Sequence, residues 1–262
     1  MSEVHWQKLR REQVAEIAAA GGVLLLPIGA IEQHGPHLPI DTDISAATAV
    51  CERAAIRLAA SDDPPALVLP PIWWGLSPYW IGFAGTLTLR PETILALISD
   101  LGASVAQHGF RRLVIVNGHG GNEGIIAVAA TQLASHGLRA AALSYWALIG
   151  EELRQWSRHD GGGIGHAGEV ETSIARFLQP DLVADPPPAA QCADLAAMAS
   201  KPFAGIGYAQ PDPAREAPNG VYGHAPAGRT ELGERIIERA GEGLAEFVRD
   251  FAGEGDVNRG LR

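Results

Sequence analysis

Residues Gly22–Gly29 read GVLLLPIG, a continuous apolar run that ends where proline and glycine interrupt it. An uninterrupted run of this kind is typical of a strand buried on both faces, as the strands of a parallel sheet are. Three further runs predict strands of the same sheet: Ala66–Pro70 (ALVLP), Arg112–Val116 (RLVIV) and Arg139–Tyr145. A fifth, short strand is predicted at Thr86–Leu89.

Segments with helical periodicity separate the predicted strands. They are expected at Arg11–Ala20, Ile44–Ala60, Pro91–Gln107, Glu123–His136, from the end of the fourth run to Arg158, Glu169–Leu178 and Glu231–Phe251. Alternation of strands and helices favours an α/β fold with three layers, α/β/α, and a mostly parallel central sheet. Irregular loops are expected over Pro180–Pro213, and residues 1–262 are expected to form a single domain.

Composition excludes several classes of protein. Lys and Arg number 20 against 30 Asp and Glu, a net charge of −10, which disfavours nucleic acid or an anionic membrane as the main partner. Cys51 and Cys192 are the only cysteines, so neither a disulfide framework nor a thiolate zinc cluster is expected. The N-terminus lacks the apolar core of a signal peptide, and no apolar run approaches the roughly 20 residues that span a bilayer. A cytoplasmic location is therefore expected.

Three glycine-containing loops carry the histidines and carboxylates that suggest chemistry. They are Glu32–His37 with Asp41–Asp43 after it, Asn117–Asn122 (NGHGGN), and Gly165–Glu171 (GHAGEVE). Parallel sheets bind ligands beyond the carboxyl ends of their strands, and each of the three loops is expected to follow a predicted strand. Imidazole and carboxylate together suit Zn²⁺, Mn²⁺ or Fe²⁺. A pair of such ions would activate a bridging hydroxide and polarise a carbonyl, which predicts hydrolysis.

Several of these residues have more than one interpretation. Asp43 is a metal ligand and Asp41 caps the next helix or holds its loop, or the two roles are exchanged. His37 is either a ligand or a hydrogen-bonding neighbour of one. Glu171 either orients a ligand or favours the positive end of its helix. NGHGGN lacks the lysine of a nucleotide-binding P-loop, which disfavours a phosphate site.

The aromatic loop PPIWWGLSPYWIGFAG follows the second predicted strand. Its tryptophans Trp73, Trp74 and Trp80 are candidates for an apolar substrate-binding wall over the site, although packing is the favoured interpretation for at least one of them.

Three blocks of sequence, in this order, resemble the signature blocks of the creatininase (creatinine amidohydrolase) family. They are LLPIGAIEQHGPHLPIDTDI, NGHGGN and GHAGEVETS. The resemblance implies a layered α/β/α fold, a cytoplasmic location, two divalent metal ions and a homo-oligomer, commonly a hexamer. Activities known in the family are opening of the creatinine ring, deformylation of a formamidopyrimidine nucleotide, cleavage of a mycofactocin precursor peptide and hydrolysis of 3-dehydro-scyllo-inosose.

The resemblance also implies metal ligands at numbered positions. Glu32 and His119 match ligands of one ion, His34 matches a ligand of the other, and Asp43 matches the carboxylate that bridges them.

The chain departs from creatinine-cleaving members at Gly121, where they carry a glutamate that binds metal. Glu169 is the expected replacement. His166 matches the family's catalytic histidine, which shuttles a proton or stabilises the tetrahedral oxyanion, and Trp146 resembles a tryptophan that closes over creatinine. Glu171 completes the expected catalytic set.

Together these features predict a dinuclear metal-dependent hydrolase, with Zn²⁺ favoured over Mn²⁺ or Fe²⁺, that attacks a carbonyl of a small molecule. A cyclic or linear amide C–N bond is the expected target. The alternatives are a cyclic ketone such as 3-dehydro-scyllo-inosose, a formamidopyrimidine nucleotide, or a metal-binding scaffold subunit without activity.

Overall fold

The computed structural model describes residues 3–61, 63–157, 164–189 and 216–253. Much of the predicted loop region Pro180–Pro213 lies outside these residues, as does Cys192.

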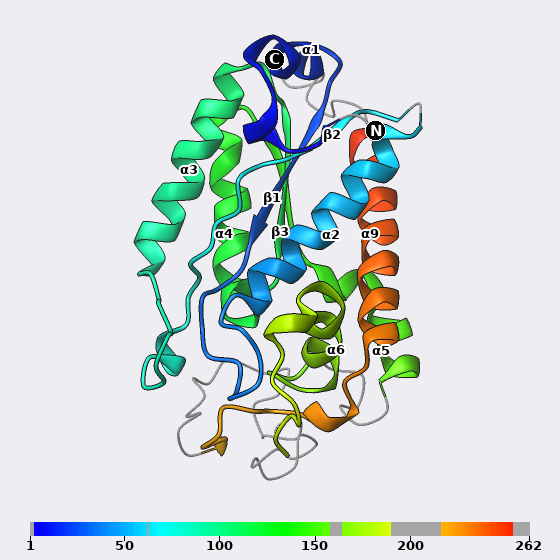
Figure 1. Ribbon diagram of the computed structural model, residues 1–262. Coiled ribbons are helices and arrows are strands. Elements are labelled where there is room, and N and C mark those ends of the chain that lie inside the picture. The colour runs from blue at the N-terminus through cyan, green and yellow to red at the C-terminus, as the bar shows by residue number, and fades with distance from the viewer. Residues whose placement is uncertain (1–2, 62, 158–163, 190–215, 254–262) are drawn as a thin grey trace.

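A parallel sheet forms the centre of the structure (Figure 1). The described residues give it four strands in the order β2-β1-β3-β4, with bounds β1 Val23–Ile28, β2 Ala66–Val68, β3 Arg112–Asn117 and β4 Arg139–Ser144. β1 and β3 pair in register along their whole length, from Val23 opposite Arg112 to Ile28 opposite Asn117. All six residues of β1 are buried, as the uninterrupted apolar run predicts. The parallel sheet is thus confirmed.

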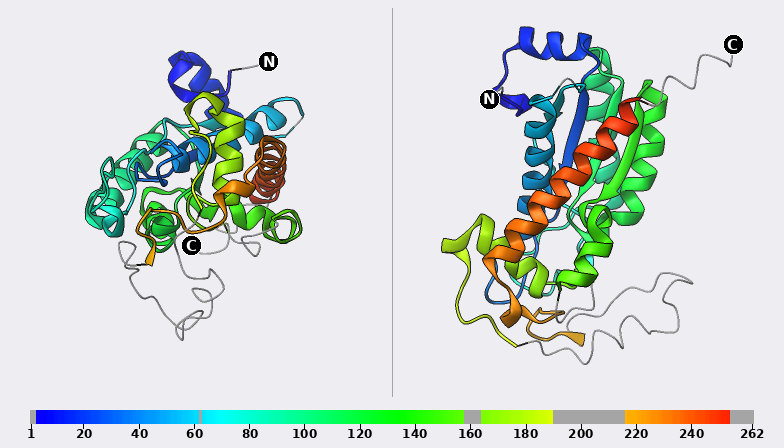
Figure 2. Two further views of the ribbon diagram at one scale, coloured as in Figure 1. Left: turned by 60° about the horizontal axis from the view of Figure 1, so that its bottom comes forward. Right: turned by 90° about the vertical axis from the view of Figure 1, so that its right-hand side faces the viewer.

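Helices cover both faces of this sheet, which confirms the three-layer α/β/α prediction (Figures 1 and 2). Successive side chains of β1 point to opposite faces, so Val23 and Leu25 belong to one apolar core while Leu24 and Leu26 belong to the other. The first core is covered by α2 Thr42–Ala59, α5 Gly150–Trp156, α6 Glu169–Leu178 and α9 Thr230–Gly253; the second is covered by α1 Arg11–Ala19, α3 Pro91–Gln107 and α4 Glu123–Leu133.

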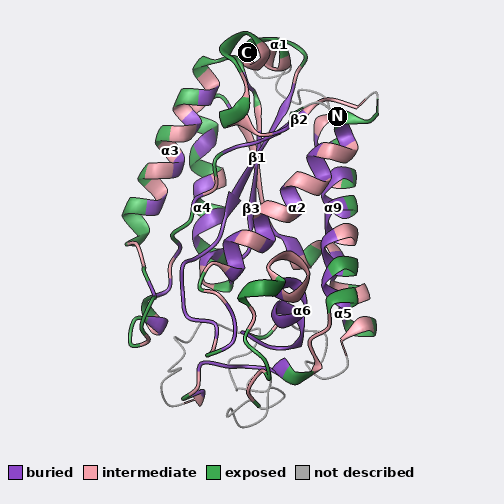
Figure 3. Cartoon of the chain, in the orientation of Figure 1, coloured by how far each residue is buried: buried purple, intermediate pink, exposed green. Residues whose placement is uncertain are grey.

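Exposed residues follow the outer sides of α3 and α9 (Figure 3). The carboxyl ends of the strands point to the lower end of Figure 1, where α2 begins and α6 lies. None of the helices in the described parts of the chain is both long and apolar enough to cross a bilayer.

Two local predictions were wrong. Thr86–Leu89 is not a strand, because Leu87 makes only a single antiparallel bridge to Ile31 and the backbone N–H of Leu89 donates to Gly75 instead. The last predicted strand ends at Ser144 rather than Tyr145. A 3-10 helix, Tyr145–Ile149, then precedes α5, which ends at Trp156.

Candidate metal centre

The three histidine- and carboxylate-bearing loops meet at the carboxyl end of the sheet. Glu32 and His34 lie on the loop after β1, Asp43 is in the first turn of α2, and His119 follows β3 directly. His166 and Glu171 come from the segment that leads into α6 and from its first turn. These residues line or border a cavity of about 350 Å³.

The buried ligand atoms form three overlapping groups within the described residues. Each group consists of three side chains whose nitrogen or oxygen atoms all lie within 4.8 Å of one another. The groups are Glu32–Asp43–His119, His34–Asp43–Glu171 and Glu32–His34–His166. Because Asp43 belongs to the first two, one carboxylate lies between two potential cation positions.

The distances show how tightly Asp43 joins the two halves of the site. Its Oδ1 lies 3.0 Å from Nε2 of His34, and its Oδ2 lies 2.9 Å from Nδ1 of His119. Nδ1 of His119 is also 3.3 Å from Oε1 of Glu32, and Nε2 of His34 is 3.6 Å from Oε2 of Glu171. Separations near 3 Å suit pairs of atoms that bind a common cation.

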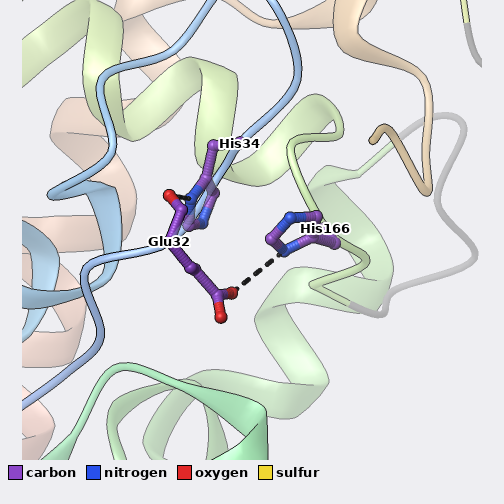
Figure 4. A group of neighbouring side chains, drawn as sticks. All are labelled: Glu32, His34 and His166. Atoms are coloured by element: carbon purple, nitrogen blue, oxygen red, sulfur yellow. Dashed lines mark hydrogen bonds and ion pairs between the residues drawn. The ribbon is translucent and has the colours of Figure 1, made fainter. Parts of the chain in front are cut away.

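His166 faces the same centre from the opposite wall. Its Nδ1 lies 3.6 Å from Oε1 of Glu32, and Figure 4 shows the two side chains pointing toward each other beside His34. The ring of Trp80 stacks on His166 with centroids 4.4 Å apart and planes at 21°. This stacking fixes the orientation of the imidazole.

Backbone carbonyls decide which nitrogen of each imidazole faces the cavity. Nδ1 of His34 lies 3.1 Å from the carbonyl oxygen of Glu32, Nε2 of His119 lies 3.1 Å from that of Leu76, and Nε2 of His166 lies 2.8 Å from that of Gln33. A carbonyl oxygen only accepts hydrogen bonds, so each of these nitrogens carries the proton of the neutral ring. The opposite nitrogens then turn their lone pairs toward the carboxylates.

The imidazole lone pairs and the carboxylates that they face repel one another unless positive charge lies between them. Both carboxylate oxygens of Glu32 and Oδ2 of Asp43 are buried and have no hydrogen-bond partner in the described part of the chain. Buried acceptors without a donor are costly unless a cation satisfies them. Imidazole nitrogen with carboxylate oxygen is the donor set that Zn²⁺ and Mn²⁺ accept, so the residues present fit divalent cations.

In the absence of cations, protons take up this role. Burial disfavours the imidazolium of His34, but the charges of Asp43 and Glu171 outweigh it and raise its pKa to about 10. The pKa of His119 is likewise raised well above its usual value, because Glu32 and Asp43 overcome the effect of burial. Burial raises the pKa of Glu171 to about 8.

His166 behaves in the opposite way. Burial, together with the positive charge on His34, lowers the pKa of His166 well below the usual value for histidine. Its imidazole is therefore neutral at pH 7 and able to accept a proton at Nδ1.

Glu169 does not join the cluster that the sequence predicted for it. Its Oε1 accepts a hydrogen bond from Nη1 of Arg229 at 2.6 Å, and its Oε2 accepts one from Oγ of Ser157 at 3.0 Å. None of the three ligand groups among the described residues contains it, whereas Glu171 belongs to one. The carboxylate that the α6 segment brings to the centre is thus that of Glu171.

Asp41 and His37, for which the sequence left two interpretations each, are not among the grouped ligands of the described residues. Oδ2 of Asp41 accepts hydrogen bonds from Ser45 and Gln179, so this carboxylate holds the start of α2. Nε2 of His37 lies 2.9 Å from Oγ1 of Thr172, and burial lowers the pKa of His37 to about 4.

The tryptophans divide between the cavity and the surface. Trp80 and Trp146 line the cavity. Trp73 and Trp74 are 44% and 45% exposed and are absent from the described lining.

Sequence reasoning missed Tyr79 and Tyr222, which also line the cavity. The position of Tyr79 beside Trp80 in the aromatic loop was the available signal for the first.

The chain matches a known family along most of its length. The family model described as Creatininase: Creatinine amidohydrolase matches residues 7–248. Creatinine amidohydrolase from Pseudomonas putida is 33% identical over 272 residues, which cover 95% of this chain and 96% of the relative.

Two other relatives carry different names. The mycofactocin precursor peptide peptidase of Mycobacterium ulcerans is 39% identical over 163 residues, 61% of this chain and 60% of that protein. The 3-dehydro-scyllo-inosose hydrolase of Thermotoga maritima is 26% identical over 268 residues, 95% and 83% of the two chains.

Solved structures of creatininases share the fold. A creatininase structure described as an Mn form has a TM-score of 0.75 and 32% identity, and covers 95% of this chain and 98% of the other. A creatininase mutant described as Zn-Zn type has a TM-score of 0.74 and 32% identity, with the same coverage of 95% and 98%.

Proposed function

The chain belongs to the creatinine amidohydrolase family of hydrolases, and from this premise we propose that it holds two divalent cations on a shared Asp43 and hydrolyses a C–N bond of a small, uncharged amide. One observation carries the proposal. The two ligand groups Glu32–Asp43–His119 and His34–Asp43–Glu171 share Asp43, and buried carboxylate oxygens of Glu32 and Asp43 have no hydrogen-bond donor among the described residues.

Each proposed cation has three protein ligands in this arrangement. Glu171 takes the place in the second group that the sequence suggested for Glu169, because its side chain faces His34 and Asp43. Zn²⁺ is favoured for its preference for nitrogen and carboxylate ligands, and Mn²⁺ and Fe²⁺ are compatible with the same set. The Zn-Zn and Mn descriptions of related creatininase structures support both metals.

Cations held by these two groups would lower the pKa of a bound water, so that a nucleophile forms at neutral pH, and would polarise the carbonyl under attack. The side chains supply the proton transfers. Neutral His166 accepts a proton from the attacking water at Nδ1, the nitrogen that faces Glu32, and then donates it to the departing nitrogen of the amide. The carbonyl of Gln33 and the ring of Trp80 keep His166 in that orientation throughout.

The cavity wall favours an uncharged, planar substrate. Its described lining contains four aromatic side chains and neither lysine nor arginine: Tyr79, Trp80, Trp146 and Tyr222. Flat aromatic walls bind planar groups by stacking. A phosphate, by contrast, calls for arginine, lysine or a nest of backbone N–H groups. Cyclic amides such as creatinine therefore fit better than a formamidopyrimidine nucleotide.

Hydrolysis of a cyclic ketone is the second candidate. The Thermotoga maritima relative named for that activity covers 95% of this chain, and water attack on a polarised carbonyl is common to both reactions.

The test is an assay of protein reconstituted with Zn²⁺ or Mn²⁺, against creatinine, short peptides, formamide-bearing pyrimidines and cyclic ketones. Cation content is measured on the same samples. We expect two cations per chain and turnover of an amide, abolished by a chelator and restored by the metal. Two bound cations with no turnover of any substrate would support the scaffold alternative, and no bound cation would refute the proposal.

We also propose that the protein forms a homo-oligomer, a hexamer as the family resemblance implies. Trp73, Trp74, Ile81 and Leu87 share one segment of the chain and are 44–59% exposed, which is unusual for large apolar side chains at a solvated surface. Light scattering of the purified protein, compared with a variant in which Trp73 and Trp74 are both serine, tests this assignment.

A further inference from the structure

Three oxygen atoms surround the outer nitrogen of the His119 ring, Nε2. Nε2 lies 3.1 Å from the carbonyl oxygen of Leu76, 3.2 Å from Oγ of Ser77 and 3.2 Å from the hydroxyl of Tyr79. The ring of Tyr79 also lies nearly parallel to that of His119, with centroids 6.2 Å apart and planes at 19°. All three oxygens belong to residues of the aromatic loop.

The backbone of this loop is held firmly in place. The N–H of Leu76 donates to Oδ1 of Asn122 at 2.9 Å, and the N–H of Ser77 donates to Oγ1 of Thr88 at 2.9 Å. The amide of Asn122 in turn donates to the carbonyl of Gly29 at the end of β1. These hydrogen bonds connect the aromatic loop to the sheet and to the loop that carries His119, so the three oxygen atoms are fixed relative to the His119 ring.

Gly121 makes this close approach possible. A Cβ atom at this position would lie 2.4 Å from Nε2 of His119, 2.4 Å from the carbonyl oxygen of Leu76 and 2.6 Å from the hydroxyl of Tyr79. Such distances are far below van der Waals contact, and the backbone oxygen cannot swing away. A Cβ on the neighbouring Gly120 would meet nothing within 4 Å.

We propose that Tyr79 is a positioning residue for His119, and that it acts only because residue 121 is glycine. The phenol and its two companion oxygens hold the proton on Nε2 and so aim the lone pair of Nδ1 at Glu32 and Asp43. Hydrogen bonds to the outer nitrogen of a metal-binding histidine fix its tautomer and increase the basicity of the inner one. This inference rests on the proposed function, because it assigns a residue that serves the proposed cation of the Glu32–Asp43–His119 group.

Tyr79 has a second consequence for the cavity. Its side chain is one of the lining residues, on the side where Gly121 offers no side chain of its own. The wall beside His119 is thus an aromatic ring with a neutral hydroxyl group.

The carboxylates in the two ligand groups number three (Glu32, Asp43 and Glu171), so two divalent cations would leave the centre with one net positive charge before water binds.

The test compares Tyr79→Phe and Gly121→Ala with two matched controls. Tyr222→Phe removes a hydroxyl from the same cavity, and Gly120→Ala adds a methyl group to the same loop where there is space for it. Binding of Zn²⁺ and Mn²⁺ is measured by calorimetry and chelator competition. Nitrogen NMR of the histidine side chains of the zinc-loaded protein identifies the tautomer of His119.

Loss of such an outer hydrogen bond typically costs about 10–100-fold in metal affinity. We expect Tyr79→Phe to weaken one of the two cation sites by about tenfold and Gly121→Ala by about a hundredfold, with the other site unchanged. Both controls should bind both cations as the natural protein does. The His119 signals, and not those of His34, should shift in Tyr79→Phe.

Equal affinity of Tyr79→Phe and the natural protein at both sites would overturn the inference, while leaving the proposed function intact. Failure of the natural protein to bind cations would refute the proposed function itself, so the two outcomes are distinct. If Gly121→Ala does not fold, the single-atom change Tyr79→Phe still decides the question, with metal-free thermal unfolding as the check that it folds.

Discussion

Asp43→Asn is the change that most directly tests the shared carboxylate. Each oxygen of Asp43 belongs to a different half of the site, with Oδ1 at 3.0 Å from His34 and Oδ2 at 2.9 Å from His119. Replacement by the isosteric amide removes one charged ligand from two groups of three, so both cations should be lost together. No other described residue appears in both of these groups.

The magnitude follows from mass action. A cation present at a hundred times its Kd stabilises the folded state by about 2.7 kcal/mol per site, so two sites contribute about 5 kcal/mol. For a chain of this size, each kcal/mol moves the Tm by roughly 2–4 °C. Adding Zn²⁺ should therefore raise the Tm of the natural protein by roughly 10–20 °C and that of Asp43→Asn by little.

The assay is calorimetric unfolding with and without Zn²⁺, together with cation content by mass spectrometry. The rise in Tm on adding the ion is the quantity compared, because Asp43→Asn also removes ion pairs to His34 and His119 from the metal-free protein. Asp41→Asn is the matched control, since Asp41 is two residues away and bonds Ser45 and Gln179 instead. It should keep both cations. An Asp43→Asn protein that retained two cations and the full rise in Tm would show that Asp43 does not bridge them.

Three further changes test the other parts of the site. His166→Gln should lower turnover by about 10²–10⁴-fold and leave cation content unchanged, because the side chain moves a proton; a parallel loss of cation would make it a ligand instead. Glu171→Gln should lose one cation of two, whereas Glu169→Gln should keep both. Glu169→Gln should instead lower the free energy of unfolding by about 2 kcal/mol, because Arg229 loses its hydrogen bond to a buried carboxylate. Metal analysis and urea unfolding separate the two variants, and the reverse pattern would restore Glu169 as the ligand. The metal-free protein should become less stable between about pH 6.5 and pH 10. The pKa of His34 is raised to about 10, so its contribution to stability is complete below the usual pKa of histidine and is lost as the pH rises through 10. Glu171, with its pKa raised to about 8, acts in the same direction. Thermal unfolding at a series of pH values measures the effect, and a Tm of the metal-free protein that rose over that range would contradict it.

The central sheet was predictable because its signal is local. β1 and β3 each read as an uninterrupted apolar run, and such runs report burial on both faces whatever the partners are. Thr86–Leu89 was mistaken for a strand because strand pairing depends on distant backbone groups. Leu87 finds only one such partner, at Ile31.

The cluster at the carboxyl edge was only partly predictable. Glu32, His34, Asp43 and His119 follow strands or begin a helix, and parallel topology brings those points to one edge. The aromatic loop carries no periodic signal. The approach of Tyr79 to His119 depends instead on hydrogen bonds that the backbone N–H groups of Leu76 and Ser77 donate to Asn122 and Thr88, and Asn122 is 46 residues away from Leu76 in the sequence.

The amino-acid sequence by itself determined the layered fold and the residue types that converge at the edge of the sheet, since apolar runs and the ends of strands are properties of the local chain. Only the tertiary structure decided between Glu169 and Glu171. Residues two apart on a helix point roughly 200° apart around its axis, so one must face away when the other faces His34 and Asp43. Which of them faces inward is set by how α6 packs against α2 and α9, and no short motif contains that rotation.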